Sequence, residues 1–143
     1  MTNDSAKYIL KGIEILDISL KYPEKPKEKI NKYGFDLGLE HKVNFNNKLI
    51  FVVPTINVFN QKDKTELGSI RVSCAFEVEN FDQFVDNEKQ VLNFPEEFET
   101  AINSVSISTA RGIMYAQFRA TFLQNALLPI VDPNSLKRAK QKN

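Results

Sequence analysis

The sequence lacks the residues on which many catalytic sites depend. It has no tryptophan, one cysteine (Cys74) and one histidine (His41) among 143 residues. A single cysteine cannot close a disulfide within the chain, and no metal-ligand spacing surrounds it. The five glycines are scattered, so no glycine-rich loop is present to cradle a phosphate group. We therefore predict no catalytic residues, no metal site and no cofactor.

Other absences bear on location and partners. No apolar run approaches the ~18 residues of a membrane span, and residues 1–7 (MTNDSAK) lack the apolar core of a secretion signal. The net charge is only +1, which argues against nucleic acid or a membrane as a partner of the whole chain. We expect a cytoplasmic protein. The basic residues 137–142 are typical of a solvated tail, and no aromatic platform supports the alternative of a nucleic-acid contact there.

What is present is an ordinary globular composition. Apolar residues make up 42% and charged residues 26% of the chain, proportions that indicate a folded domain. A chain of this length buries a core without disulfides and is too short for two comfortable domains. We predict a single domain, with tails at residues 1–6 and 137–143.

The first predicted strand, residues 8–22, has an internal irregularity. Its apolar side chains alternate at Ile13 and Ile15 and then shift phase to Leu16 and Ile18. A shift of one residue in the period-two pattern is what a β-bulge produces. We therefore expect a long strand with a bulge near its middle.

Three more strands are predicted, at residues 35–45, 49–59 and 69–81. The connection after the first strand is long and contains prolines, so the second strand need not lie beside the first. Pro54, within the third strand, cannot donate a ladder hydrogen bond, and we expect an edge position or a bulge there. Residues 82–93 are charged and are predicted to form a loop.

A long helix is predicted from about residue 95 to about residue 124. Pro95 and the carboxylates of Glu96 and Glu97 are typical of a helix start, and a short last helix is expected after Asn134. The fold class is therefore predicted to be α+β: a four-stranded antiparallel sheet with a crossover connection, followed by one long and one short helix.

The long helix is apolar on more sides than a sheet can cover. The two predicted faces comprise Phe98, Ile102, Val105 and Gly112 on one side and Ile107, Ala110, Met114, Phe118, Thr121 and Phe122 on the other. A helix on a sheet needs one apolar stripe, and monomers rarely expose large apolar patches. The second side must meet a partner chain, another subunit or a ligand, unless the protein's own loops cover it.

The titratable residues favour structural roles. His41 stands between Glu40 and Lys42 and is expected to be solvated. Cys74 alternates with Val72, in the pattern of a buried strand face, and is expected to be a structural thiol. An enzyme would require a polar cavity that contains one of these two groups.

Three short motifs, in order along the chain, resemble the SecB export chaperones. LDISL (residues 16–20), followed by Pro23 and Pro26, resembles the first strand and crossover loop of that family. ARG (residues 110–112) looks like its Arg-Gly pair, and LPIVD (residues 128–132) looks like its link to the last helix. With the order of elements, the resemblance covers about residues 7–136.

The resemblance implies a fold, an assembly and an activity. Two protomers would pair their sheets and two dimers would sandwich their long helices, so that the second helix face meets other subunits. Unfolded client polypeptides would bind, without nucleotide, in apolar grooves beside the crossover loop and helices. The predicted client-binding residues are Tyr22, Ile30, Tyr33, Phe118, Phe122, Leu127, Leu128 and Ile130. The predicted oligomer interface comprises Ile13, Ile15, Ile18, Ile102, Val105 and Met114.

The sequence departs from that family in two ways. About eight additional residues, roughly two turns of helix, separate residues 110–112 from residues 128–132. Lys21 and Arg71 stand where acids that dock the SecA motor are expected, and only Asp17 of that acidic face remains. A surface of SecA that attracts acids repels bases at the same positions. This argues against SecA docking.

We therefore predict a divergent SecB-like holdase, acting in protein export or on a dedicated client such as an antitoxin. The alternative is an oligomeric structural or adaptor protein with the same fold and no client groove.

Overall fold

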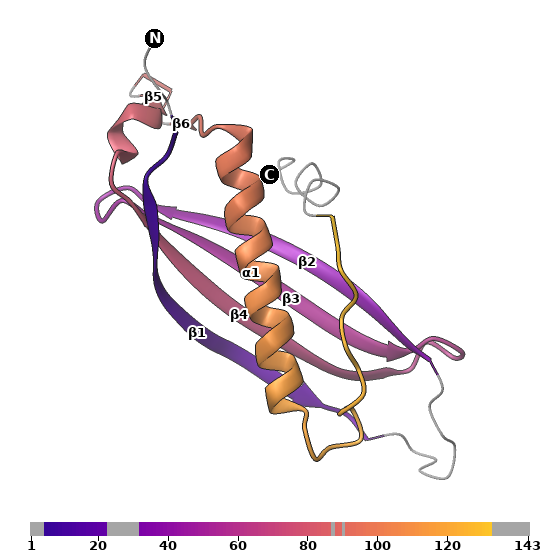
Figure 1. The fold of residues 1–143 in the computed structure, drawn as a ribbon. Helices are drawn as coiled ribbons and strands as arrows, with labels where there is room; N and C mark the ends of the chain where they lie inside the picture. The colour runs from indigo at the N-terminus through magenta and orange to yellow at the C-terminus, as the bar shows by residue number, and fades with distance from the viewer. Residues whose placement is uncertain (1–4, 23–31, 87, 90, 133–143) are drawn as a thin grey trace.

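The computed structural model describes residues 5–22, 32–86, 88–89 and 91–132. The elements in chain order are β1 (Tyr8–Leu20), β2 (Tyr33–Asn44), β3 (Leu49–Asn60), β4 (Glu66–Val78), the 3₁₀ helix η1 (Phe81–Phe84), β5 (Val85–Asp86), β6 (Val91–Leu92) and α1 (Glu96–Gln117). Figure 1 shows α1 lying across one face of the four-stranded sheet. The predicted α+β class, with its antiparallel sheet and long helix, is confirmed. The short helix expected after Asn134 lies outside the described residues.

The large sheet has the strand order β1-β4-β3-β2, and every pairing is antiparallel. The first two strands therefore lie at opposite edges of the sheet, so β2 is not beside β1, in agreement with the predicted crossover topology. Within the described part of the chain, no helix has the length and apolar character needed to cross a membrane.

The predicted bulge in β1 is confirmed. The register against β4 shifts between Ile15 and Asp17, which leaves Leu16 as the extra residue. A second shift, between Leu10 and Gly12, was not predicted. Because β1 is an edge strand and α1 packs on β3 and β4, both faces of β1 remain exposed over most of its length.

The expectation for Pro54 is wrong. Pro54 lies in β3, an inner strand between β4 and β2, and pairs with Leu39 of β2 without a bulge. Against β4, the ladder has a gap at Val53 and Pro54, and the register is the same on both sides of this gap. The missing N–H of Pro54 thus interrupts the β3–β4 ladder locally. The alternation of apolar residues along β3 keeps the register on both sides.

The core forms between α1 and the inner face of the sheet. Large apolar side chains there are almost fully buried, and each contributes roughly 1.5–3 kcal/mol by leaving water. They include Ile56, Ile70, Val72 and Phe76 from the sheet and Phe98, Ile102, Ile107 and Met114 from α1.

The long helix ends seven residues earlier than predicted, at Gln117 rather than about residue 124. The Phe118 N–H still donates to the Met114 carbonyl, but Ala120 adopts a left-handed conformation with φ of 64° that a helix cannot continue. The Thr121 hydroxyl then donates to the Phe118 carbonyl at 2.6 Å. Residues 118–125 form turns.

This early end changes the interpretation of the two apolar faces. Phe118 and Leu123 project from turns and are buried in the protein's own core. The large apolar side chains that α1 itself exposes are Val105 and Tyr115. The chain thus covers part of the apolar surface that was assigned to a partner.

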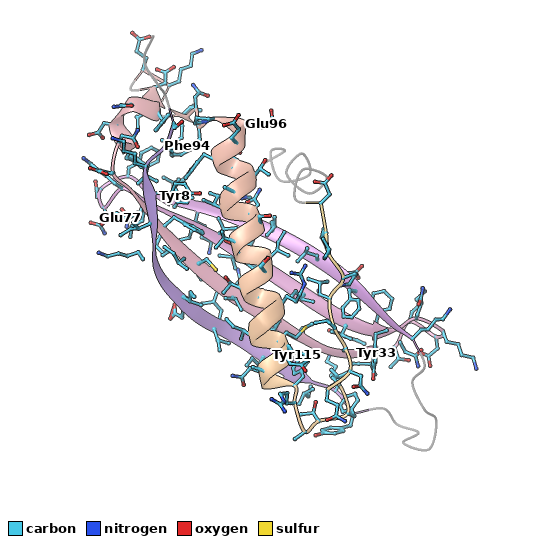
Figure 2. The ribbon with its side chains drawn as sticks, viewed as in Figure 1. Tyr8, Tyr33, Glu77, Phe94, Glu96 and Tyr115 are labelled. Carbon is cyan, nitrogen blue, oxygen red and sulfur yellow. The ribbon has the colours of Figure 1, made fainter. Side chains whose placement is uncertain are left out.

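Residues 82–93 are not the loop that was predicted. They contain most of η1 and the two short strands β5 and β6, which pair with each other. Aromatic rings hold this unit against the start of α1: Phe94 contacts Phe84 and Phe98, and Phe98 contacts Tyr8. Tyr8 and Phe94 lie at the end of the molecule where α1 begins (Figure 2).

Candidate functional site

Three of the predicted client-binding residues meet where β1 ends and β2 begins. The rings of Tyr22, just after β1, and Phe122, in the turns after α1, lie 4.8 Å apart between centroids. The Tyr33 hydroxyl, at the start of β2, donates to the Phe122 carbonyl at 3.3 Å. We call Tyr22, Tyr33 and Phe122 the end cluster. Segments far apart in sequence thus build one aromatic surface.

Two further predicted residues extend apolar surface beyond the end cluster. Tyr22 is 72% exposed, Leu127 is 54% exposed and Ile130 is 95% exposed, whereas Tyr33 and Phe122 are half-buried. Isolated exposed apolar residues are common on soluble proteins. An aromatic cluster followed by exposed aliphatic residues is the pattern of a binding surface.

Leu127 and Ile130 belong to an extended segment, residues 126–132, that we call the strap. Figure 1 shows it running back along α1, opposite to the helix direction. Leu128 is buried while its neighbours Leu127 and Pro129 are exposed. The Arg111 guanidinium donates from Nε to the Leu128 carbonyl at 2.9 Å and from Nη2 to the Pro129 carbonyl at 3.0 Å.

The other predicted client-binding residues lie elsewhere. Phe118 and Leu128 are buried in the subunit core, at 1% and 3% exposure. Ile30 lies outside the described residues. Client contact by Phe118 or Leu128 would therefore require local opening of the fold.

The predicted oligomer interface divides into two groups. Ile13, Ile15 and Ile18 are exposed on β1, a strand whose outer edge has no partner among the described strands. A long, apolar, unpaired edge is a template for pairing with another chain. The predicted interface did not include three more exposed aliphatic residues of this strand, although its apolar sequence indicates them: Ile9, Leu10 and Leu16.

The interface residues predicted on α1 face in different directions. Ile102 and Met114 are buried against the subunit's own sheet, whereas Val105 is 38% exposed. Only Val105 of these three is available to another subunit without a change in the fold.

The two bases that replace expected acids are paired within the chain. Lys21 Nζ lies 2.8 Å from Glu66 Oε2, and Arg71 Nη2 lies 2.8 Å from Glu40 Oε1. Arg71 is also the register partner of Asp17 on β1. Asp17, the single remaining acid of the expected face, therefore lies opposite an arginine in the strand register.

The two titratable groups considered for catalysis differ in burial. Cys74 is fully buried, as predicted, and desolvation raises the pKa of its thiol, while hydrogen bonds with Ser106 and Thr109 oppose that shift. His41 is exposed, as predicted, but its Nε2 also lies 2.6 Å from Oδ1 of the buried Asn103. Among the described residues, no three His, Cys, Asp or Glu side chains converge to hold a metal ion.

A cleft of about 930 Å³ was not predicted and lies at the opposite end from the end cluster. It separates the start of β1 from the first turns of α1, and its lining includes Ala6, Tyr8, Phe98, Ala101 and Glu97. Tyr8 and Glu96, both lining residues, are labelled in Figure 2. The cleft is wide open and combines aromatic surface with carboxylates.

Comparison with known proteins gives a fold relationship. No protein-family model matches the chain, and no curated protein sequence matches it. Among solved structures, the chain is similar to the SecB-like chaperone Rv1957 of Mycobacterium tuberculosis, solved in complex with a ChAD peptide from the Rv1956 HigA1 antitoxin. The TM-score is 0.54 at 14% identity, with 87% of this chain and 90% of that chain covered. The protein therefore has a SecB-like fold.

Proposed function

We propose that this protein is a SecB-like holdase that binds unfolded or non-native polypeptides. The observation that carries the proposal is the end cluster of Tyr22, Tyr33 and Phe122, continued by the exposed Leu127 and Ile130. Aromatic and branched side chains on an open surface suit apolar client segments of varied sequence, because they present no charged group that demands a specific partner.

The mechanism is passive. Client segments lose apolar surface to the end cluster and strap, at roughly 25 cal/mol per Å², and are held away from aggregation partners. A protein that binds only the unfolded state shifts the folding equilibrium of its client by mass action. No group on the surface needs to change its covalent state. Pairing of the client backbone with a strand edge is an additional source of affinity.

The edge strand β1 suits an assembly of subunits. Exposed Ile13, Ile15 and Ile18 favour pairing with β1 of a second copy, and Val105 on the outer side of α1 favours a further contact between dimers. We therefore propose a dimer of dimers. Such pairing satisfies the edge backbone groups and buries side chains that would otherwise invite aggregation.

A dedicated client is favoured over the general export motor. Rv1957, the solved chaperone with a similar fold, is in complex with a peptide from an antitoxin. An antitoxin is therefore one candidate client of the present protein. Lys21 and Arg71, which pair with Glu66 and Glu40, stand where the resemblance to SecB implies acids for SecA docking, and these bases support a partner other than SecA. We propose that the protein works in the cytoplasm on its own client.

The test is suppression of aggregation. A model protein, unfolded by reduction of its disulfides, is diluted with and without this protein, and light scattering is followed. We expect scattering to fall with increasing holdase until the binding sites are saturated. Undiminished scattering at a several-fold molar excess would contradict the proposal.

The alternative is an oligomeric structural or adaptor protein. It is favoured by the burial of Phe118 and Leu128 within the subunit, which removes two predicted residues from the surface. It predicts that subunit contacts fill every apolar face. A naphthalene sulfonate dye would then bind negligibly to the native oligomer, whereas a holdase with open apolar surface increases the dye's fluorescence.

A further inference from the structure

The chain after α1 is attached to the body of the protein in two different ways. Its first part, residues 118–125, is fixed by Phe118 and Leu123, which are both buried. Leu123 Cδ1 lies 2.7 Å from the position a Cβ would occupy at Gly68 of β4, so the glycine permits this close contact. The first part is therefore a firm anchor.

The strap that follows has far fewer attachments. The Ala126 N–H donates to the Leu123 carbonyl at 2.9 Å. In the described structure, no backbone–backbone hydrogen bond joins residues 127–131 to the sheet or to α1. Leu128 is the strap's most deeply buried large side chain, at 3% exposure. Its carbonyl and that of Pro129 accept hydrogen bonds from Arg111.

Arg111 is built to hold two carbonyls at once. Its planar guanidinium presents Nε and Nη2 in a fixed fork, and the two donor–acceptor distances are 2.9 and 3.0 Å. Its other terminal nitrogen makes only a long contact, 3.5 Å, with the Ser108 hydroxyl. Charge-assisted hydrogen bonds are stronger than neutral ones, so one side chain firmly holds the middle of the strap through its Leu128 and Pro129 carbonyls.

The strap also has the chemistry of a client segment. Residues 127–131 are extended and apolar and make no backbone–backbone hydrogen bond in the described structure, and they run beside α1 directly after the end cluster. We propose that the inward side of the strap is a built-in competitor of the client: Arg111 holds Leu128 on the surface that an extended apolar segment of unfolded polypeptide occupies after displacing it, while Leu127 and Ile130 face outward and contact the client. This inference rests on the proposed function and assigns Arg111 as a positioning residue for that surface.

The competition has a quantitative consequence. If only the fraction of molecules with a displaced strap binds the client, the apparent dissociation constant is the intrinsic one divided by that fraction. Weakening the strap's attachment therefore raises client affinity, the opposite of what loss of a direct client contact would do. That difference in sign separates the competitor role from an ordinary binding role.

The experiment compares Arg111→Met, which removes all hydrogen-bond donors of the side chain, with Arg111→Lys, which keeps the positive charge but has a single donor nitrogen. Ser108→Ala is the matched control, because it removes only the 3.5 Å contact. The rate at which thermolysin, which cuts before large apolar residues, cleaves the chain within residues 127–131 is measured without client, and affinity is measured by fluorescence anisotropy with a labelled, reduced and carboxymethylated model protein. For Arg111→Met we expect about tenfold faster cleavage of the strap and several-fold tighter binding. We expect Arg111→Lys to be intermediate and Ser108→Ala to match the wild type.

Two results would overturn the inference. An unchanged cleavage rate in Arg111→Met would show that Arg111 does not hold the strap. Faster cleavage with equal or weaker client binding would show that the strap does not compete with the client. If Arg111→Met fails to fold, Arg111→Lys provides the same comparison. Failure of the proposed function is a different result, in which neither the wild type nor any variant binds the unfolded protein.

Discussion

Arg71 of β4 reaches across β3 to Glu40 of β2, with 2.8 Å between Nη2 and Oε1. The pair connects strands that are not neighbours in the sheet, on the face away from α1. A base at this position therefore has a partner within its own subunit. Lys21, the second base that replaces an expected acid, forms the corresponding pair with Glu66.

Replacing Arg71 is expected to have a small effect on stability. The side chains of Arg71 and Glu40 are 34% and 45% exposed, so water screens the pair. We predict that Arg71→Met lowers the free energy of unfolding by about 0.5 kcal/mol, measured by urea denaturation. Lys21→Met is the control, with a smaller effect because that pair is more exposed. A loss of several kcal/mol for Arg71→Met would show that the pair is far more strongly coupled than its exposure implies.

Two substitutions on α1 are expected to act by different routes. Met114 is fully buried and Val105 is 38% exposed. Met114→Glu buries an unpaired carboxylate, at several kcal/mol, and should unfold the subunit. Val105→Glu should leave the circular dichroism of the subunit intact and reduce its native mass. An unchanged native mass for Val105→Glu would exclude this face of α1 from the assembly.

The edge strand provides a second test of the assembly. Ile13→Lys places a charge on β1 where the proposed pairing partner would lie, and charges on edge strands block such pairing. We expect a lower native mass with little change in the unfolding midpoint, because Ile13 is half-exposed in the subunit. Val91→Lys, on the small β5–β6 sheet, is the matched control. If both variants keep the wild-type mass, β1 does not form the interface.

Local sequence patterns were sufficient for much of this fold. The period-two alternation predicted the four large strands, and the phase change after Ile15 predicted a bulge. Pro95 and the glutamates after it located the start of α1 to within a residue. These signals are local, because they depend on the twofold pleat of a strand and on the dipole of a helix end.

The errors arose where tertiary contacts decide the structure. The end of α1 at Gln117 has neither glycine nor proline, and the left-handed Ala120 is stabilised by burial of Phe118 and Leu123. Pro54 occupies an inner strand because its neighbours' apolar pattern outweighs one lost donor. The interaction of Arg111 with the strap joins residues 17 and 18 positions apart, and no local pattern predicts it.

The buried thiol predicts a pH effect on stability. Burial raises the pKa of Cys74 above its usual 9.0, so the native state keeps the proton to higher pH than the unfolded chain does. Below pH 9 both states are protonated and the contribution is constant. Above it the unfolded chain loses the proton first, and stability falls until the folded pKa is passed. We expect this decline to be steeper in the wild type than in Cys74→Ala, measured by urea denaturation from pH 7 to 10. If the free energy of unfolding falls with pH equally in the wild type and in Cys74→Ala, the Cys74 thiol is not the cause of the decline.

The proposed client surface predicts a loss of affinity without a loss of stability. Ile130 is 95% exposed, so Ile130→Asp removes no core contact. We predict several-fold weaker binding of a labelled unfolded protein and an unfolding midpoint within experimental error of the wild type. Val91→Asp, also an exposed apolar residue but on β6, serves as the control and should bind normally. Equal affinity in both variants would show that Ile130 is not part of the client surface.

The central claim, that the protein holds non-native polypeptides as an oligomer, is tested most directly by native mass. Light scattering is measured for the protein alone, with a folded model protein, and with the same protein unfolded by disulfide reduction. We predict a tetramer that gains mass with the unfolded protein and not with the folded one. A monomer whose mass is unchanged by either would contradict the account and leave a SecB-like fold without the holdase activity.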